Sequence, residues 1–231
     1  MTAHARSFAL ALTLAAVLLA GTACSGDTKP EASAEDTLAA AKKNLDDTSG
    51  VTLGLSTPQL PSGVTGLLKA DGVATHDPAF KGSIKVAASG ITADASVVAV
   101  DGVVYAKLPF TSRFVKIDPA DYGAPDPAAL IDPDTGVSSW LTAATGLEEG
   151  NQVRDGGDVL TSYHGKLPGS AVVAVIPSAD ASGDFDATFT LDGDGRLRSA
   201  SVTGVFYKGK PSLTYVVTIT EYATEKDISA P

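Results

Sequence analysis

Short stretches of alternating apolar and polar residues, separated by turns that contain glycine, make up most of this chain. Lys81 and Lys85, for example, would fall on one face of a strand, and Ile84 and Val86 on the other. A period of two residues is typical of a strand that buries one face. Turns such as Asp101-Gly102 join consecutive antiparallel strands. The pattern predicts an antiparallel meander with strands at 51–56, 64–73, 81–89, 91–100, 103–108, 113–117, 151–155, 158–166, 184–191, 196–207 and 212–222.

A few segments have helical spacing instead. Ser33 opens an S-x-x-D capping box before the first of them, and Ser170 is placed to cap the last. Helices are expected at 34–48, 127–130, 135–145 and 171–176, although the β-branched residues of 171–176 equally allow a strand. We therefore expect one α+β domain over residues 34–223, a curved antiparallel sheet with helices on one face, and a polar tail over 224–231.

The N-terminus has the pattern of an export signal with a lipid attachment site. The uncharged run Phe8–Gly21 is shorter than the roughly 20 residues that a spanning helix needs. Small residues then precede Cys24, as in a lipobox. We expect residues 1–23 to be a lipoprotein signal peptide, Cys24 to carry a diacylglyceryl group with palmitate among its acyl chains, and residues 24–33 to form a flexible tether. The alternative is an ordinary signal peptide with a chance cysteine.

Charge and residue usage exclude several functions. The net charge is −10, and removing residues 1–23 removes one further positive charge, so binding to nucleic-acid phosphates is disfavoured. Cys24 is the only cysteine, which excludes an intrachain disulfide and a cysteine metal cluster. Ser162 and His164 lack a G-x-S-x-G elbow, and Asp192-x-Asp194 lacks the remaining ligands of a calcium loop. We expect no enzyme, no metal and no cofactor.

Two neighbouring strands are apolar on both faces. Residues 97–100 and 103–106 do not alternate, whereas an antiparallel strand usually has one solvated face. Such strands need cover on both sides, and small residues such as Ala93, Ala95 and Ala99 leave room for an apolar guest. Ordinary dense packing explains the same composition, so the residues alone leave both interpretations open.

Three motifs resemble one protein family. They are VDGVVYAKL at 100–108, IDP at 117–119 and ALIDPDTGV at 129–137. Together with the lipobox, the tether and the first helix, they are similar to the LppX/LprAFG family of actinobacterial lipoproteins, most of all to its LprG branch. The resemblance implies a curved β half-barrel, similar to the LolA/LolB carriers, with helices on the concave face and a large hydrophobic cavity between sheet and helices.

The same resemblance implies residues and partners. It places Ile84, in the local match Gly82-Ser83-Ile84-Lys85, on the cavity wall. The expected lining set is Ile84, Val86, Val98, Val100, Val104, Val137, Trp140 and Leu141. Expected partners are acylated lipids or glycolipids, the plasma membrane through the lipid anchor, and an envelope transporter.

The sequence therefore predicts a non-enzymatic lipoprotein, anchored on the extracytoplasmic face of the cell membrane, that carries acylated lipids through the cell envelope. The alternative is a lipid-anchored structural or signalling module that keeps a filled core and binds a protein partner. Lipid that co-purifies with the protein would favour the carrier over the module.

Overall fold

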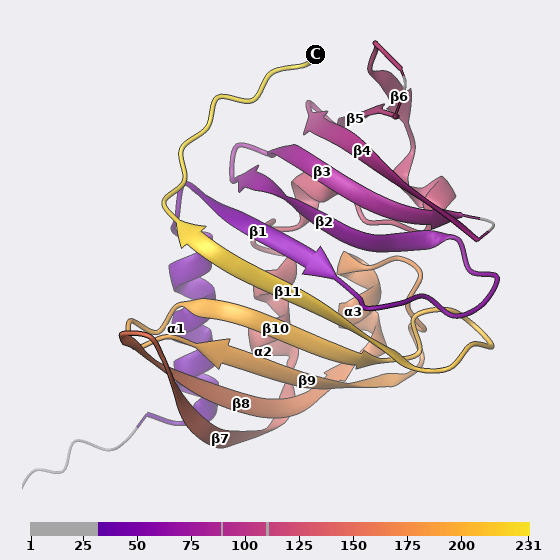
Figure 1. Cartoon of the computed structure of the whole chain (residues 1–231). Coiled ribbons are helices and arrows are strands. Elements are labelled where there is room, and N and C mark those ends of the chain that lie inside the picture. Colours follow the sequence, from indigo (N-terminus) through magenta and orange to yellow (C-terminus); the bar gives the residue numbers. More distant parts are fainter. Residues whose placement is uncertain (1–31, 89, 110) are drawn as a thin grey trace, which may run out of the picture. The chain divides into compact units, whose positions relative to one another are not determined.

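One antiparallel sheet organises the described part of the chain (Figure 1). The computed structural model describes residues 32–88, 90–109 and 111–231, of which Ala32–Pro231 forms one compact unit. The predicted signal peptide, Cys24 and most of the tether lie outside the described residues. The strands are β1 (Gly50–Ser56), β2 (Gly66–Thr75), β3 (Ala79–Ala88), β4 (Ile91–Val100), β5 (Val103–Lys107), β6 (Val115–Ile117), β7 (Thr145–Asp155), β8 (Asp158–Pro168), β9 (Asp184–Leu191), β10 (Leu197–Gly204) and β11 (Leu213–Tyr222).

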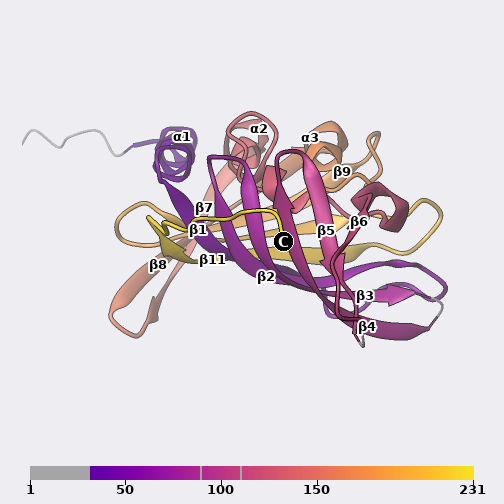
Figure 2. The same cartoon turned by 90° about the horizontal axis from the view of Figure 1, so that it is seen from above.

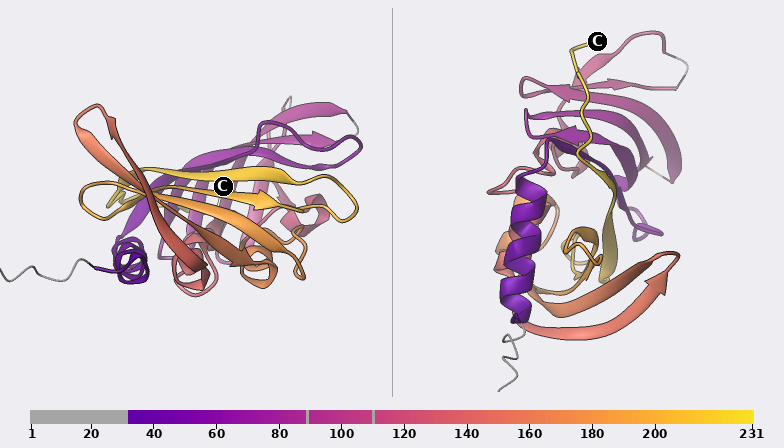
Figure 3. Two further views of the ribbon diagram at one scale, coloured as in Figure 1. Left: turned by 90° about the horizontal axis from the view of Figure 1, so that it is seen from below. Right: turned by 90° about the vertical axis from the view of Figure 1, so that its left-hand side faces the viewer.

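The strand order is β6-β5-β4-β3-β2-β1-β11-β10-β9-β8-β7. Each pair of neighbours is antiparallel, so the predicted meander is confirmed. Only the pairing of β1 with β11 joins segments far apart in the sequence, and it connects a half made of β1–β6 to a half made of β7–β11. Figures 2 and 3 show the sheet curving around a layer of helices, which is the α+β half-barrel expected from the sequence.

Turn residues fix the hairpins as predicted. Asp101 and Gly102 both have positive φ, 53° and 69°, as a two-residue hairpin turn of type I′ requires. At the β9–β10 turn, the Asp192 carboxylate accepts hydrogen bonds from the backbone N–H groups of Asp194 and Arg196, each at 3.0 Å. This carboxylate therefore stabilises a turn.

The helices lie together on the concave side of the sheet (Figure 2). Ser33 caps α1 by accepting the backbone N–H of Asp36 at 3.1 Å, and the inward stripe of α1 buries Leu38, Ala41 and Leu45. The helical segments are α1 (Ala34–Asp46), η1 (Pro119–Tyr122), η2 (Pro127–Ala129), η3 (Val137–Ser139), α2 (Trp140–Ala143) and α3 (Gly169–Val175).

Several boundaries differ from the sequence-based expectation: β10, for example, ends at Gly204 instead of residue 207, and the helix expected at 135–145 is the short η3 followed by α2. Helix α3 begins at Gly169 and its N-cap is Pro168, so Ser170 does not cap it. Strand β7 begins at Thr145 instead of residue 151, because two register shifts against β8 interrupt the alternation on which the prediction relied. At each bulge the alternation of inward and outward side chains is interrupted, although the two strands stay paired.

A lysine joins the helical layer to the loop before η3. The Lys42 ammonium of α1 donates to the Asp46 carboxylate at 2.6 Å, to the Pro133 carbonyl at 2.5 Å and to the Ser138 hydroxyl at 3.3 Å. The Asp132 carboxylate shapes the same loop, and its pKa is lowered chiefly by the hydrogen bond from the Thr135 backbone N–H. These contacts hold η3 and the loop before it against α1. The inner face of β1–β5 is covered by a different segment, which is described below.

Candidate functional site

An apolar pocket lies on the inner face of the sheet, between β1–β5 and the segment that follows β6. Its volume is about 40 Å³. Every lining side chain is uncharged, and the Tyr122 hydroxyl is the one polar side-chain group among them. The lining residues are Leu55, Leu67, Ala70, Ile84, Val86, Val97, Val104, Ile117, Pro119, Tyr122, Ala124, Pro125, Pro127 and Leu130.

Side-chain size explains why the pocket forms at this place. Ile84 on β3 pairs across the sheet with Ala70 of β2 and Ala95 of β4. Cross-strand partners share a face of the sheet, so a long aliphatic side chain here stands between two short ones. Nearer the other end of β3, the Phe80 ring covers Gly72 and Gly82, because a Cβ on either glycine would come within 3 Å of that ring. The Phe80 ring occupies the space above the two glycines, whereas the short side chains beside Ile84 leave a pocket.

Residues 118–130, which we call the roof segment, close the pocket on the side opposite the sheet. The carboxylates of Asp118 and Asp126 cap η1 and η2 by accepting the backbone N–H groups of Ala120 and Ala128, each at 2.9 Å. In the described part of the chain, the hydrogen bonds of residues 119–129 all end within residues 118–132. Apolar packing alone therefore holds the body of the roof segment against the sheet.

A buried tyrosine fixes the end of the pocket near β2. The Tyr215 hydroxyl donates to the Leu67 carbonyl at 2.7 Å and lies 3.1 Å from the Tyr207 hydroxyl. Burial, with the Tyr207 hydroxyl as a second cause, raises the pKa of Tyr215. The Tyr215 phenol therefore stays neutral, and it positions Leu67 as part of the wall.

The predicted lining residues separate into three groups. Ile84, Val86 and Val104 line the pocket. Val98 and Val100 lie on the outer face of β4, because the alternation that points Val97 inward turns its neighbours outward. Val137, Trp140 and Leu141 are buried in the helical layer and do not line this pocket.

Packing explains the position of Trp140 within the helical layer. Its indole N–H donates to the Ala171 carbonyl at 3.1 Å, which ties α2 to α3. The sequence-based lining set also lacked five residues of the sheet, Leu55, Leu67, Ala70, Val97 and Ile117, and every residue of the roof segment, such as Pro119, Pro125 and Pro127. The roof residues offered little to predict them from. Their only signal was an unusual density of Asp-Pro and Ala-Pro pairs between two strands.

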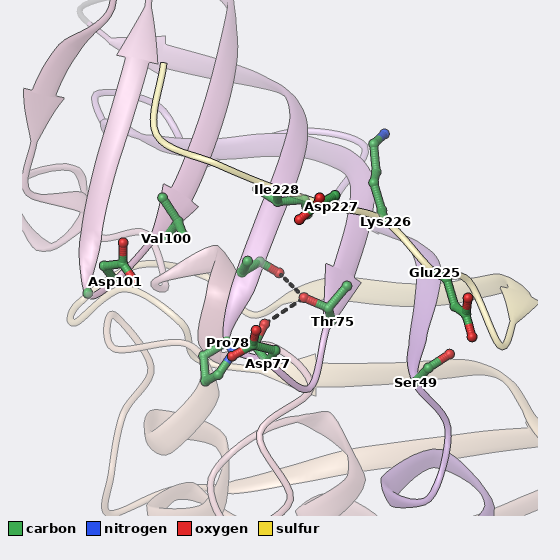
Figure 4. Close-up of a pocket in the computed structure, with 12 residues that line it drawn as sticks. Ser49, Thr75, Asp77, Pro78, Val100, Asp101, Glu225, Lys226, Asp227 and Ile228 are labelled. Atoms are coloured by element: carbon green, nitrogen blue, oxygen red, sulfur yellow. Dashed lines mark hydrogen bonds between the residues drawn. The ribbon is translucent and has the colours of Figure 1, made fainter.

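A second and larger hollow lies where the C-terminal tail crosses the β2–β3 and β4–β5 turns (Figure 4). It has a volume of about 680 Å³ and is open and polar. The side chains of Asp77, Asp101, Glu225 and Asp227 line it, with Lys226 as the one basic residue. This concentration of carboxylates suits neither an acyl chain nor a phosphate headgroup, so we place the candidate site at the apolar pocket.

The described side chains with catalytic or metal-binding chemistry have other partners. The Ser162 hydroxyl donates to the Asn151 carbonyl, and the His164 ring pairs with the Thr188 hydroxyl, so the two side chains do not form a nucleophile–base pair. The His76 ring contacts the Leu45 carbonyl at 2.9 Å. Among the described residues no cluster of three or more His, Cys, Asp or Glu side chains is arranged to hold a metal ion. The described helices include none that is long and apolar enough to cross a membrane.

The fold and the pocket define an open antiparallel half-barrel with an apolar site between its inner face and a helical layer. The chain belongs to the LppX_LprAFG lipoprotein family, whose model matches residues 33–230. The lipoarabinomannan carrier protein LprG of Mycobacterium tuberculosis is 28% identical over 211 residues, which cover 86% of each chain. LprG of Mycobacterium bovis is equally similar.

Solved structures share the fold. LprF of Mycobacterium bovis superposes with a TM-score of 0.69 at 14% identity, over 86% of this chain and 96% of LprF. LppX of Mycobacterium tuberculosis superposes with a TM-score of 0.62 at 16% identity, over 85% of this chain and 98% of LppX. The family resemblance inferred from the motifs is therefore confirmed.

Proposed function

We propose that this protein is a membrane-anchored carrier that binds the acyl chains of lipids or glycolipids in the pocket around Ile84 and has no catalytic role. The observation that carries the proposal is the uncharged pocket, closed by a segment that makes no hydrogen bond to the sheet. Family membership and the relatives named lipoarabinomannan carriers support it. Acylated glycolipids of the lipoarabinomannan type are the proposed cargo, and an envelope transporter is the proposed partner.

Loading requires the roof segment to move. An apolar cavity of about 150 Å³ binds one benzene molecule, whereas this pocket has a volume of only about 40 Å³. In place of the large cavity that the family resemblance implies, this structure has a narrow pocket, because the roof segment packs against the concave face. We infer that cargo displaces the roof segment and takes over its apolar contacts with β1–β5.

The energy of transfer is large enough for such a displacement. Each buried CH₂ gains about 0.8 kcal/mol, so one sixteen-carbon chain gains on the order of 10 kcal/mol before ordering costs. The roof segment would lose the partial burial of Ala124 and Tyr122 and the burial of four apolar residues, Pro125, Pro127, Ala128 and Leu130. A single acyl chain thus offsets the contacts that it would replace.

Cys24 is the proposed anchor, on the extracytoplasmic face of the cell membrane. Replacing it (Cys24→Ala) removes the sulfur that would carry the diacylglyceryl group. The variant is expected in the soluble or secreted fraction, measured by cell fractionation and immunoblotting. Unchanged membrane partition would refute the lipobox assignment and leave the pocket assignment untouched.

A second candidate function follows from the small volume of the pocket. A lipoprotein that binds a protein partner through a filled core would also show a pocket of about 40 Å³. Organic extraction and mass spectrometry of the chain lacking residues 1–24, purified from a host with acylated glycolipids, separate the two functions. Stoichiometric acylated lipid supports the carrier. A chain that purifies empty and takes up no added lipid supports the partner-binding module.

A further inference from the structure

The inner face of the β3–β4 hairpin stays apolar beyond the edge of the pocket. Side chains alternate along a strand and Ile84 points inward, so Val86 and Ala88 point inward with it. Their partners on β4 are Ala93, which pairs with Val86, and Ile91, which pairs with Ala88. We call Val86, Ala88, Ala93 and Ile91 the inner strip. It leads from the pocket, which Val86 lines, to the end of the hairpin.

Exposure along the inner face of β4 rises in one direction. In order toward the β3–β4 turn, the inward residues are Ala99, Val97, Ala95, Ala93 and Ile91. The first three are at most 6% exposed, Ala93 is half-buried and Ile91 is 72% exposed. The hairpin ends on the side of the molecule away from α1 (Figures 1 and 2). The inner face is therefore covered near the β4–β5 turn and open to solvent at the β3–β4 turn.

Strand β6 changes in the same direction. Ile117 pairs with Val104, lines the pocket and is half-buried. Val115 points to the same side, pairs with Ala106 one step nearer the open end, and is 50% exposed. The open end of the inner face thus extends across β3–β6.

A phenyl ring closes the other end of the inner face. Phe80 is fully buried and pairs with Ala99. Its ring leans along β3 toward Ile84, because it covers Gly82, the inward residue between the two. An acyl chain in the pocket would meet this ring in one direction and the open inner strip in the other.

Contact with water alone does not explain an apolar strip at an exposed strand end. An antiparallel strand carries polar residues on a face that meets solvent. The outer face of the hairpin follows this rule at the same level, with Thr92 beside Lys85 and Asp94, which form an ion pair at 3.6 Å. The inner face carries only aliphatic residues there. Exposed apolar surface of this kind marks a binding site, and here it continues directly from a pocket.

We propose that the inner strip is the entrance of the lipid site, and that an acyl chain lies along β3 and β4 with its terminal methyl toward Phe80 and its headgroup at the Ile91 end. This inference rests on the carrier function and adds the direction of the bound chain. The acyl chain is the occupant because the strip joins the pocket at Val86, has no charged side chain, and leads to a closed end. The headgroup stays in water, since the pocket lining has no charged group to pair with a phosphate.

Fluorescence quenching with single-cysteine variants measures this direction. Cys24 is the only cysteine, so the chain lacking residues 1–24 has none, and a fluorophore can be attached at one introduced thiol. Thr92→Cys places it on the outer side of the open end, and Asp77→Cys places it at the exposed β2–β3 turn, beyond Phe80. Strand β3 has ten residues, so its ends lie about 30 Å apart. A short-range quencher on the chain distinguishes them.

The probe is lysophosphatidylcholine with a nitroxide on its acyl chain, either beside the glycerol ester or beside the terminal methyl. We expect the nitroxide beside the ester to quench the Thr92→Cys label more than the Asp77→Cys label, and the nitroxide beside the methyl to reverse that order. Equal quenching of the two labels, or the opposite order, would overturn the proposed direction. An unaltered chain that takes up no probe would refute the carrier function, and this inference with it.

A substitution at the entrance gives an independent test. Ile91→Asn should weaken probe binding about ten-fold, because it removes one aliphatic side chain that the acyl chain would cover. Val153→Asn, at a 60% exposed position in the β7–β8 hairpin, is the matched control and should bind like the unaltered chain. Unchanged binding by Ile91→Asn would refute the entrance. If that variant also lost self-association in light scattering, the inner strip would be an interface between copies of the chain instead.

Discussion

Ile84→Trp tests whether the pocket opens. Ile84 stands between Ala70 and Ala95 and faces the roof segment. The tryptophan side chain has six more heavy atoms than the isoleucine side chain that it replaces, and the free volume of about 40 Å³ is too small to take them. The ring must push the roof segment away from the sheet. Because apolar packing alone holds that segment, we expect a loss of about 1–2 kcal/mol in the free energy of unfolding, within the range for overpacking.

Ile219→Trp is the matched control. Ile219 is an isoleucine on the inner face of the same sheet, but it is buried in the core cluster and lines none of the pockets described above. The roof segment does not cover Ile219, so no weakly held segment can move aside for the larger ring. The same substitution should therefore lower the free energy of unfolding by about 3 kcal/mol or more, or prevent folding. Guanidinium unfolding gives both free energies, and extraction with mass spectrometry gives the bound lipid. We expect Ile84→Trp to fold and purify without lipid.

Equal destabilisation by the two substitutions would refute this reasoning. It would mean that the roof segment is as rigidly packed as the core around Ile219 and that the pocket does not open. The partner-binding module would then replace the carrier. Folded Ile84→Trp that still retains stoichiometric lipid would place the cargo elsewhere on the molecule.

Other predictions concern the architecture that positions the pocket. Lys42→Met should cost about 1–2 kcal/mol in urea unfolding, since it removes the donor that serves the part-buried Asp46 carboxylate and the buried Ser138 hydroxyl, whereas the exposed Lys43→Met should change stability by less than about 0.5 kcal/mol. The lowered pKa of Asp132 means that its carboxylate stabilises the fold above about pH 4 and loses that effect as pH falls through the folded pKa. Asp132→Asn keeps an acceptor oxygen but does not titrate, so its stability deficit relative to the unaltered chain should shrink on acidification. Gly204→Ala should lower the free energy of unfolding by about 3 kcal/mol or more, because its Cβ would lie 2.2 Å from the buried Phe185 ring. Gly157→Ala has open space around its Cβ and should leave the melting temperature unchanged.

The strands and hairpins could be predicted because their signals are local. Alternation placed Lys81 and Lys85 on one face of β3 and Ile84 on the other, and the Asp-Gly turn marked the end of β4. Ser33 marked the start of α1 through its capping box, which forms as expected. Each of these signals depends on residues within one or two turns of chain, so no tertiary information was needed.

The sequence did not show which residues of the apolar run 97–100 point toward the inner face of the sheet. Residues 97–100 are all apolar, so the sequence does not say which of them point inward, and Val98 and Val100 turned out to face outward. The register with Ile84 through Ala95 decides the phase, and that register is a tertiary contact. The Val98 side is apolar because Tyr105 lies beside it on the outer face. The run does not alternate because Val97 faces the apolar pocket on the inner side, whereas Val98 lies beside Tyr105 on the outer side.

The roof segment was missed for a related reason. Its proline residues prevent any regular period, so residues 119–127 carried no signal of which side chains would be buried. Their burial depends on docking against β2–β4, which are distant in sequence. A segment with few local preferences and no hydrogen bonds to its neighbour is also one that can dock and undock without unfolding the sheet.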